Sequence, residues 1–91
     1  MGAEEDFKKA FEDVKKLKST PTQPQQLELY AYAKIAKGEN IEDKKPGMFD
    51  VKGKTMKNAW QKKLDEGITT EKAKELYVSL VEKLQKDLGT N

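Results

Sequence analysis

The C-terminal part of the chain carries the pattern that most restricts what this sequence can fold into. Between residues 70 and 88, apolar side chains recur three or four positions apart: Ala73, Leu76, Tyr77, Leu80, Val81, Leu84 and Leu88. This spacing places them on one face of an α-helix, and such a face has to be buried against other elements. Thr69 and Thr70 can cap the start of the helix, and Gly89 is typical of its end.

Two further amphipathic helices are predicted at positions 4–18 and 53–64. The first has a stripe formed by Phe7, Ala10, Phe11, Val14 and Leu17. It should end at Ser19-Thr20-Pro21, because a residue before proline avoids the helical conformation. The other is shorter, and in it Met56, Trp60 and Leu64 recur every four positions. Trp60 is therefore expected in the core rather than against a ligand.

Another helix is predicted over residues 23–37. Thr22 and Gln25 have the spacing of a capping box, and Gly38 is placed to end the helix. One face should hold Leu27, Tyr30, Ala31 and Lys34, and a second group turns progressively away from it: Leu29, Tyr32 and Ala33. No segment has the alternation of a β-strand. The chain is therefore predicted to be a single all-α domain, residues 1–91, built as a four-helix bundle.

The connection between the second and third helices is long for so small a chain. Residues 39–52 have no helical period, and Pro46-Gly47 marks a turn within them. Loops of this length are often functional. We expect at least one of the three apolar residues Met48, Phe49 and Val51 to fill the core and pin the loop.

Lysines are concentrated around this loop. Between Lys44 and Lys63 there are seven lysines and one acid, Asp50, a balance of +6, whereas the rest of the chain has eleven lysines and fifteen acids. Such a basic segment beside apolar residues is suited to a polyanion. Because the chain has no arginine, phosphate would be bound by point charges rather than by two-pronged guanidinium groups.

The composition argues against catalysis. The chain has no histidine and no cysteine, which removes the commonest general base and the thiol nucleophile. No glycine-rich nucleotide motif is present, and Glu71 and Glu75 have the spacing of a solvated helix face. We therefore expect a binding protein, not an enzyme, with neither a cofactor nor a metal. The sequence has no membrane-spanning run and no signal peptide, so we expect a cytoplasmic protein.

Two kinds of ligand are compatible with these features. Lysines for phosphates, tyrosines for a base and an apolar groove between helices would together suit a nucleotide-bearing lipid. The alternative is a helical interaction module whose basic segment binds nucleic acid or an acidic partner. The absence of arginine and the negative charge outside residues 44–63 weaken that alternative.

Four stretches give a more specific signal when they are taken together. They are Leu-Glu-Leu-Tyr-Ala-Tyr-Ala-Lys (27–34), Lys-Pro-Gly-Met-Phe-Asp (45–50), Lys-Gly-Lys-Thr-Met-Lys-Asn-Ala-Trp (52–60) and the helix around Tyr77. In this combination they closely resemble the acyl-CoA-binding protein family, also called diazepam-binding inhibitor. The resemblance extends from Phe7 to Gly89.

This resemblance implies both a fold and a function. The fold is an up-down-down-up bundle of four helices with a long structured loop between the second and third. The function is to bind long-chain fatty acyl-CoA thioesters as an intracellular pool and carrier, without catalysis. We also expect a monomer with no nucleic acid partner and no stable membrane anchoring.

The resemblance assigns ligand contacts position by position. Within the family pattern Tyr-x-x-Tyr-Lys on the second helix, Tyr30 and Lys34 match the first and last residues. The remaining matches are to lysines and a tyrosine near the ligand: Lys15, Lys52, Lys54 and Tyr77.

Two positions depart from the family pattern. Ala33 stands where relatives have an adenine-stacking tyrosine, and Tyr32 lies one residue earlier, about 100° round the helix. Met56 stands where relatives have a lysine that contacts the 3′-phosphate, and Lys57 follows it. We take all four as candidate displaced contacts, with Lys57 partly replacing the missing lysine. Because these changes affect the nucleotide end, long acyl chains are expected to remain necessary for tight binding.

Overall fold

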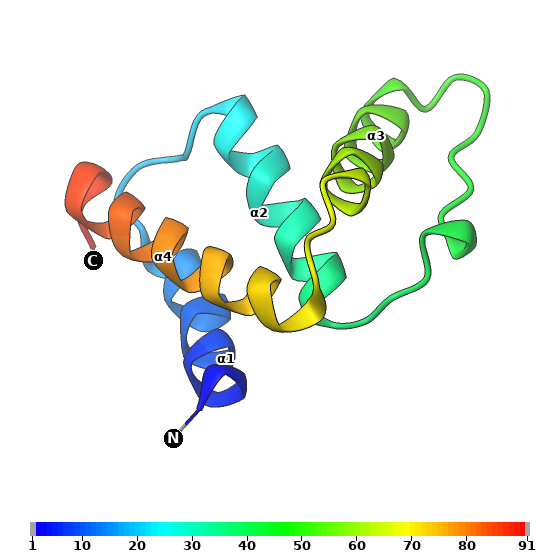
Figure 1. Ribbon diagram of the computed structural model, residues 1–91. Coiled ribbons are helices and arrows are strands. Elements are labelled where there is room, and N and C mark those ends of the chain that lie inside the picture. The colour runs from blue at the N-terminus through cyan, green and yellow to red at the C-terminus, as the bar shows by residue number, and fades with distance from the viewer. Residues whose placement is uncertain (1, 91) are drawn as a thin grey trace.

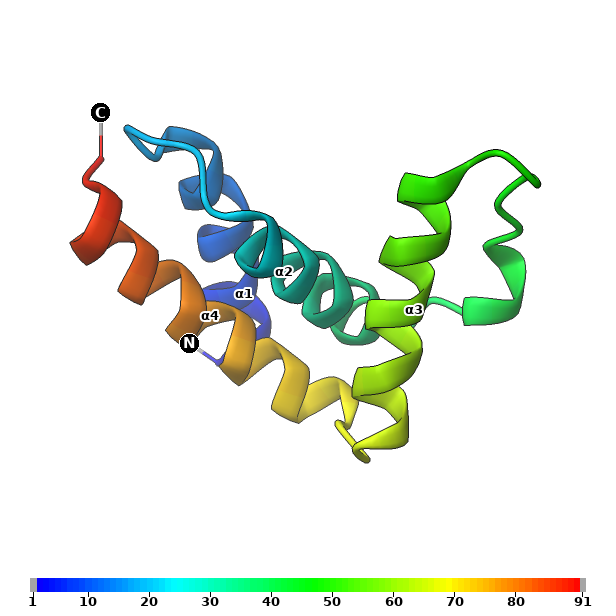
Figure 2. The same cartoon turned by 90° about the horizontal axis from the view of Figure 1, so that it is seen from above.

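The computed structural model describes residues 2–90 and confirms the all-α fold. Over these residues there are four α-helices, α1 (Ala3–Asp13), α2 (Gln23–Ala36), α3 (Val51–Asp65) and α4 (Thr70–Leu88), and two 3-10 helices, η1 (Val14–Lys16) and η2 (Ile41–Asp43). Figures 1 and 2 show α1 and α4 pointing roughly one way and α2 and α3 the other, which is the predicted up-down-down-up order. Within the described part of the chain, no helix is long and apolar enough to cross a bilayer.

The first and last helices pack along each other through aromatic rings. Phe7 and Tyr77 meet edge to face with ring centroids 5.0 Å apart, and Phe11 stacks on Tyr77 at 6.2 Å. Farther along α4, Val81 and Leu84 are almost completely buried. The stripe predicted for the last helix is therefore the face of α4 that enters the core.

Helix α2 is packed on two sides, against α3 and against α4. Its buried residues accordingly do not fall on a single face: Leu29, Ala31, Tyr32, Ala33, Ile35 and Ala36. The predicted orientation is wrong in this respect, because Tyr32 and Ala33 are buried whereas Tyr30 and Lys34 are half-buried. A one-face pattern describes a helix at the edge of a bundle, and α2 is a helix between two others.

The capping signals of α2 are confirmed. The Thr22 hydroxyl accepts a hydrogen bond from the Gln25 N–H at 3.4 Å, and Gln25 Oε1 accepts from the Thr22 N–H at 2.9 Å. Gly38 follows the helix with a φ of +71°, a conformation that residues with a side chain rarely adopt.

The first helix is shorter than the sequence predicts. α1 ends at Asp13, η1 follows, and Leu17 then forms an isolated β-bridge with Thr90. The Lys18 N–H donates to the Gly89 carbonyl at 3.0 Å. These contacts tie the end of the first helical segment to the end of α4.

The long loop is not pinned as the sequence predicts. Met48, Phe49 and Val51 are 78%, 90% and 72% exposed, so the expectation that one of them fills the core is wrong. Ile41 of η2 packs against the core instead. Near the other end of the loop, the ammonium group of Lys54 donates to the Met48 carbonyl at 2.7 Å. The loop is therefore held by polar contacts and by Ile41, and not by burial of these three side chains.

Helix α3 begins two residues earlier than predicted because Asp50 caps it. The Asp50 carboxylate accepts a hydrogen bond from the Gly53 N–H at 2.9 Å. A Cβ atom at residue 53 would collide with that carboxylate. Glycine is therefore needed here for close approach of the cap, not for an unusual φ.

Replacing Gly53 by alanine tests this cap. Alanine is about 1 kcal/mol more favourable than glycine within a helix, whereas loss of an N-cap costs about 0.5–2 kcal/mol. We expect Gly53→Ala to leave the free energy of unfolding, measured in denaturant, unchanged or lower. In an Asp50→Ala background the same change should instead stabilise the protein by about 1 kcal/mol. Equal effects in the two backgrounds would contradict the clash.

Candidate functional site

One face of α2 borders two cavities. It is formed by residues three or four positions apart along the helix: Gln23, Gln26, Leu27, Tyr30, Ala33, Lys34 and Lys37. From residue 23 to residue 37 the helical path is about 21 Å long, at 1.5 Å per residue. The face therefore suits an extended ligand rather than a compact one.

The first cavity lies between the N-terminal parts of α2 and α3 and has a volume of about 490 Å³. We call it the α2–α3 cavity, and it is lined by Gln23, Gln26, Leu27, Val51, Lys52, Thr55 and Met56. Leu27, Val51 and Met56 give it apolar walls, and Lys52 supplies the cation of its lining. This combination suits an apolar chain that has a negatively charged group nearby.

The second cavity lies where α1, α2 and α4 meet and has a volume of about 310 Å³. We call it the α1–α2–α4 cavity, and it is lined by Phe11, Val14, Leu29, Tyr30, Ala33, Lys34, Lys37 and Tyr77. Its lining combines aromatic rings with two ammonium groups. Such a composition suits a planar heterocycle that carries phosphates.

Both ammonium groups of the α1–α2–α4 cavity lie near aromatic rings. Lys34 Nζ lies 5.5 Å from the centroid of the Tyr30 ring and 2.9 Å from Oε1 of Glu39. Lys37 Nζ lies 4.2 Å from the centroid of the Phe11 ring. Contacts of these kinds at accessible sites are each worth about 1 kcal/mol or less. An anionic ligand could therefore compete for both lysines.

Tyr30 contributes a polar atom that has no partner. Its hydroxyl is buried and makes no hydrogen bond within residues 2–90, and the same holds for Nε1 of Trp60. The two rings meet edge to face, with centroids 6.1 Å apart. A buried unsatisfied polar group costs about 1–3 kcal/mol. A ligand that gained access to this hydroxyl and hydrogen-bonded to it would recover that cost.

Tyr77 forms the most deeply buried part of the same lining, at 2% exposure. Burial raises the pKa of its hydroxyl to about 12, because the phenolate would lose its hydration. The ring is fixed against Phe7 and Phe11. Tyr77 therefore keeps its proton at neutral pH and remains able to donate a hydrogen bond.

The structure brings together six of the site residues predicted from the sequence. Tyr30, Ala33, Lys34 and Tyr77 line the α1–α2–α4 cavity, and Lys52 and Met56 line the α2–α3 cavity. Lys15 lies at the edge of the former, since its Nζ is 5.3 Å from the ring of Phe11, a residue of that lining. Lys15 also pairs with Glu12 at 3.3 Å.

Three other predicted residues lie elsewhere. Lys54 is hydrogen-bonded to the backbone of the long loop. Tyr32 is buried, with its ring centroid 5.1 Å from Nζ of Lys63, and belongs to neither cavity lining. Lys57 is half-buried and also belongs to neither lining.

Several lining residues are not singled out for the site by the sequence, and Lys37 and Phe11 are the two that contribute a charge or an aromatic ring. Lys37 follows Ala33 by four positions and Tyr30 by seven, which is the spacing of one helix face, so a signal for it exists. Phe11 belongs to the apolar stripe of α1, where it reads as an ordinary core residue. Its ring lies beneath the ammonium group of Lys37, and this contact depends on how α1 packs near the C-terminal end of α2.

Comparisons with known proteins give matches over most of the chain. Residues 4–81 match the family model described as acyl CoA binding protein. The chain is 40% identical over 90 residues to an acyl-CoA-binding protein homolog of Manduca sexta, with 98% of each chain covered. It is 44% identical over 79 residues to acyl-CoA-binding protein homolog 1 of Caenorhabditis elegans, with 86% of this chain and 88% of that one covered.

A solved structure shares the arrangement of the helices. The crystal structure of acyl-CoA-binding protein 2 from Oryza sativa matches with a TM-score of 0.81 at 30% identity, covering 94% of this chain and 93% of that one. The fold and the two cavities define a small helical ligand-binding domain. The family comparisons are more specific, and the chain belongs to the acyl-CoA-binding protein family.

Proposed function

We propose that this protein binds long-chain fatty acyl-CoA thioesters and serves as an intracellular pool and carrier for them. The nucleotide end of the ligand would occupy the α1–α2–α4 cavity, and the acyl chain would extend along α2 to the α2–α3 cavity. The observation that carries the proposal is the single face of α2 that borders both cavities, with the unpaired Tyr30 hydroxyl on it. The names of the family and of its relatives support the ligand class.

The apolar chain is expected to supply much of the affinity. About ten buried methylenes at roughly 0.8 kcal/mol each contribute about 8 kcal/mol before the cost of ordering the ligand. Met56 strengthens this expectation, because it places an apolar side chain in the α2–α3 cavity.

At the nucleotide end, Lys37 is a stronger candidate for a phosphate contact than Lys57. Lys37 lines the cavity beside Lys34, whereas Lys57 belongs to neither lining. We propose that Lys34 and Lys37 share the phosphates. The other proposed contacts are those of Lys15, Lys52, Tyr30 and Tyr77, with Lys54 a weaker candidate because it also holds the loop.

The cellular role follows from the ligand and from the available chemistry. A chain without histidine or cysteine offers little for acyl transfer or hydrolysis, so we propose carriage rather than catalysis. We further propose a cytoplasmic monomer with no stable membrane anchoring.

The arrangement of the lysines favours this ligand over nucleic acid. Lys52 lines a cavity, and Lys54 bonds to the carbonyl of Met48. Lys63 lies beside Tyr32 and pairs with Glu66 at 3.7 Å. The basic segment is thus divided among separate environments, whereas a protein that follows a phosphate backbone needs a continuous stripe of cations.

Affinity should depend on the length of the acyl chain. In titration calorimetry with free CoA and with acyl-CoA thioesters of increasing length, we expect the dissociation constant to fall as the chain lengthens, because each added methylene buries more apolar surface. Free CoA should bind weakest. An affinity independent of chain length would contradict the placement of the chain in the α2–α3 cavity.

Removing only the Tyr30 hydroxyl should weaken ligand binding without lowering the stability of the ligand-free protein. Tyr30→Phe deletes an unsatisfied buried group, so the free energy of unfolding of the ligand-free protein should stay the same or rise by about 1 kcal/mol. The affinity for palmitoyl-CoA should fall about ten-fold, which corresponds to one hydrogen bond. If the affinity is unchanged, the hydroxyl makes no contact with the ligand.

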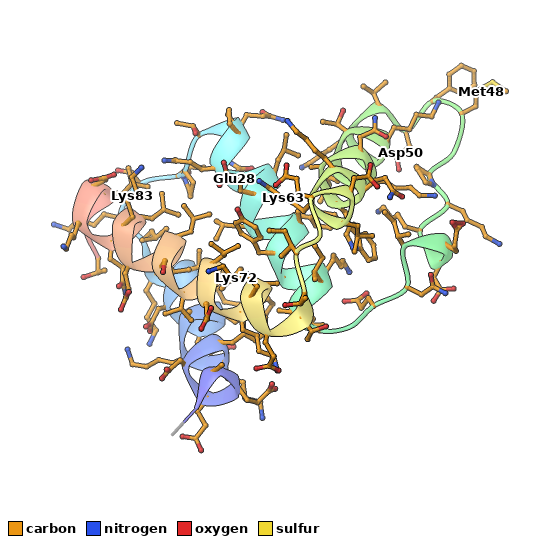
Figure 3. The ribbon with its side chains drawn as sticks, in the orientation of Figure 1. Glu28, Met48, Asp50, Lys63, Lys72 and Lys83 are labelled. Carbon is orange, nitrogen blue, oxygen red and sulfur yellow. The ribbon has the colours of Figure 1, made fainter. Side chains whose placement is uncertain are left out.

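The two candidate phosphate contacts, Lys37 and Lys57, can be compared directly. We expect Lys37→Ala to weaken binding of palmitoyl-CoA about ten-fold and to reduce its dependence on salt, because a phosphate contact is lost. Lys57→Ala should have little effect. Lys83→Ala is a control, since Lys83 lies on α4 away from both cavities (Figure 3). A larger loss with Lys57→Ala than with Lys37→Ala would reverse the assignment.

A further inference from the structure

A carboxylate from outside the α1–α2–α4 cavity holds one of the cations of its lining. The Lys34 ammonium group donates a hydrogen bond to Oε1 of Glu39 at 2.9 Å, and the two side chains are 29% and 41% exposed. Glu39 belongs to the connection between α2 and η2 and is not part of the lining. Lys37, the other cation of the lining, makes no ion pair within residues 2–90. Of the two lysines proposed to share the phosphates, Lys34 alone is thus paired with a carboxylate in the described part of the chain.

The backbone at the end of α2 directs Glu39 back to Lys34. The Gly38 N–H donates to the Ile35 carbonyl at 2.9 Å, and the Glu39 N–H donates to the Lys34 carbonyl at 3.1 Å. These two bonds form the C-terminal cap known as the Schellman motif, with Gly38 at its left-handed position. Residues 34 and 39 are therefore joined twice, once through the backbone and once through their side chains. The helix cap itself positions the carboxylate beside the ammonium group.

A phosphate of the ligand would need the same ammonium group. Carboxylates and phosphates are both anionic acceptors that form strong hydrogen bonds with lysine. Lys34 Nζ also lies 5.5 Å from the ring centroid of Tyr30 and 6.0 Å from that of Trp60, so two rings and a carboxylate are already close to it. A phosphate that reaches Lys34 either displaces the carboxylate or lies beside a second negative charge. Both alternatives lower the affinity, the first through a lost ion pair and the second through repulsion.

We propose that Glu39 is an internal competitor for the phosphates of the ligand, and that it keeps the affinity of the site below the value that the lysines alone would give. The identity of the ligand rests on the proposed acyl-CoA function. Only the Glu39 side chain has to move, because Ile41 stays packed against the core and the Asn40 side chain still accepts a hydrogen bond from the Glu42 N–H at 3.0 Å. A carrier has to give up its ligand as well as bind it, and a carboxylate that returns to Lys34 favours release.

The substitution Glu39→Gln tests the competition. Glutamine keeps the size of the side chain and removes its charge, so palmitoyl-CoA should bind about five-fold more tightly in titration calorimetry, the upper range for one accessible ion pair. Glu42→Gln is the matched control, since Glu42 is exposed, makes no ion pair within residues 2–90 and lines neither cavity. It makes the same change in net charge and should alter the affinity less than about two-fold.

Removing Lys34 separates competition from a general effect of charge. In a Lys34→Ala background the carboxylate has no ammonium group to hold, so Glu39→Gln should change the affinity no more than Glu42→Gln does. A five-fold gain that persists in this background would mean that Glu39 repels the ligand without competing for Lys34, and the proposal would be overturned. Equal affinities of the parent protein and Glu39→Gln would overturn it as well.

Inorganic pyrophosphate distinguishes this proposal from the proposed function, because it offers phosphates without an acyl chain. Its binding is followed by NMR through the backbone amides of Lys34 and Lys37, and Glu39→Gln should bind it more tightly than the parent by a similar factor. If that holds and palmitoyl-CoA binds to neither protein, the proposed function fails and the competition stands. If palmitoyl-CoA binds to both with equal affinity, the competition is overturned and the proposed function stands. If neither compound binds to either protein, both proposals fail.

Discussion

The packing of α2 between two neighbouring helices is the constraint on which the site depends. Contacts with α3 and α4 occupy two sides of α2 and bury Ala31 and Ala36 almost completely. Small side chains at such positions let helices approach closely. The side of α2 that remains carries the residues that border both cavities. Because one helix supplies both core and site, the proposed contacts are held on a rigid element whose position is set by packing.

The contact between α2 and α3 also contains buried polar atoms that lack hydrogen-bond partners. Tyr30 and Trp60 pack edge to face, and each leaves a buried polar atom without a partner within residues 2–90. Phenylalanine at position 30 would keep the ring packing and avoid the unsatisfied hydroxyl. A sequence selected for stability alone would therefore favour it. The presence of tyrosine at this position is easier to explain if a ligand completes the hydrogen bond, since functional sites are where local rules of stability are broken.

The sequence predicts the helices well and the surroundings of its apolar residues poorly, for two physical reasons. Periodicity identifies α4 because that helix buries one face, but it misplaces Tyr32 and Ala33, since α2 is buried on two sides. The expectation for the loop fails because apolar character permits burial without requiring it, as 90% exposure of Phe49 shows.

Contacts between distant segments set a further limit on what the sequence can show. The capping box at Thr22 is predictable because all of its atoms lie within four residues. The position of Lys37 over Phe11 is not, because it depends on how α1 meets α2. The family resemblance supplies roles for residues that match its motifs, and Lys37 lies outside them.

The start of α3 joins the exposed apolar residues of the long loop to the α2–α3 cavity within a few residues. Asp50 caps the helix, Val51 faces both solvent and the α2–α3 cavity, and Lys52 and Met56 line that cavity. A lysine at position 56 would put a charge into this lining. Methionine instead leaves the wall apolar, which suits the burial of hydrocarbon. The two ammonium groups on the same face of α2, those of Lys34 and Lys37, lie at the opposite end of that face, in the lining of the α1–α2–α4 cavity. The site therefore has an apolar end at the start of α3 and a cationic, aromatic end where α1, α2 and α4 meet.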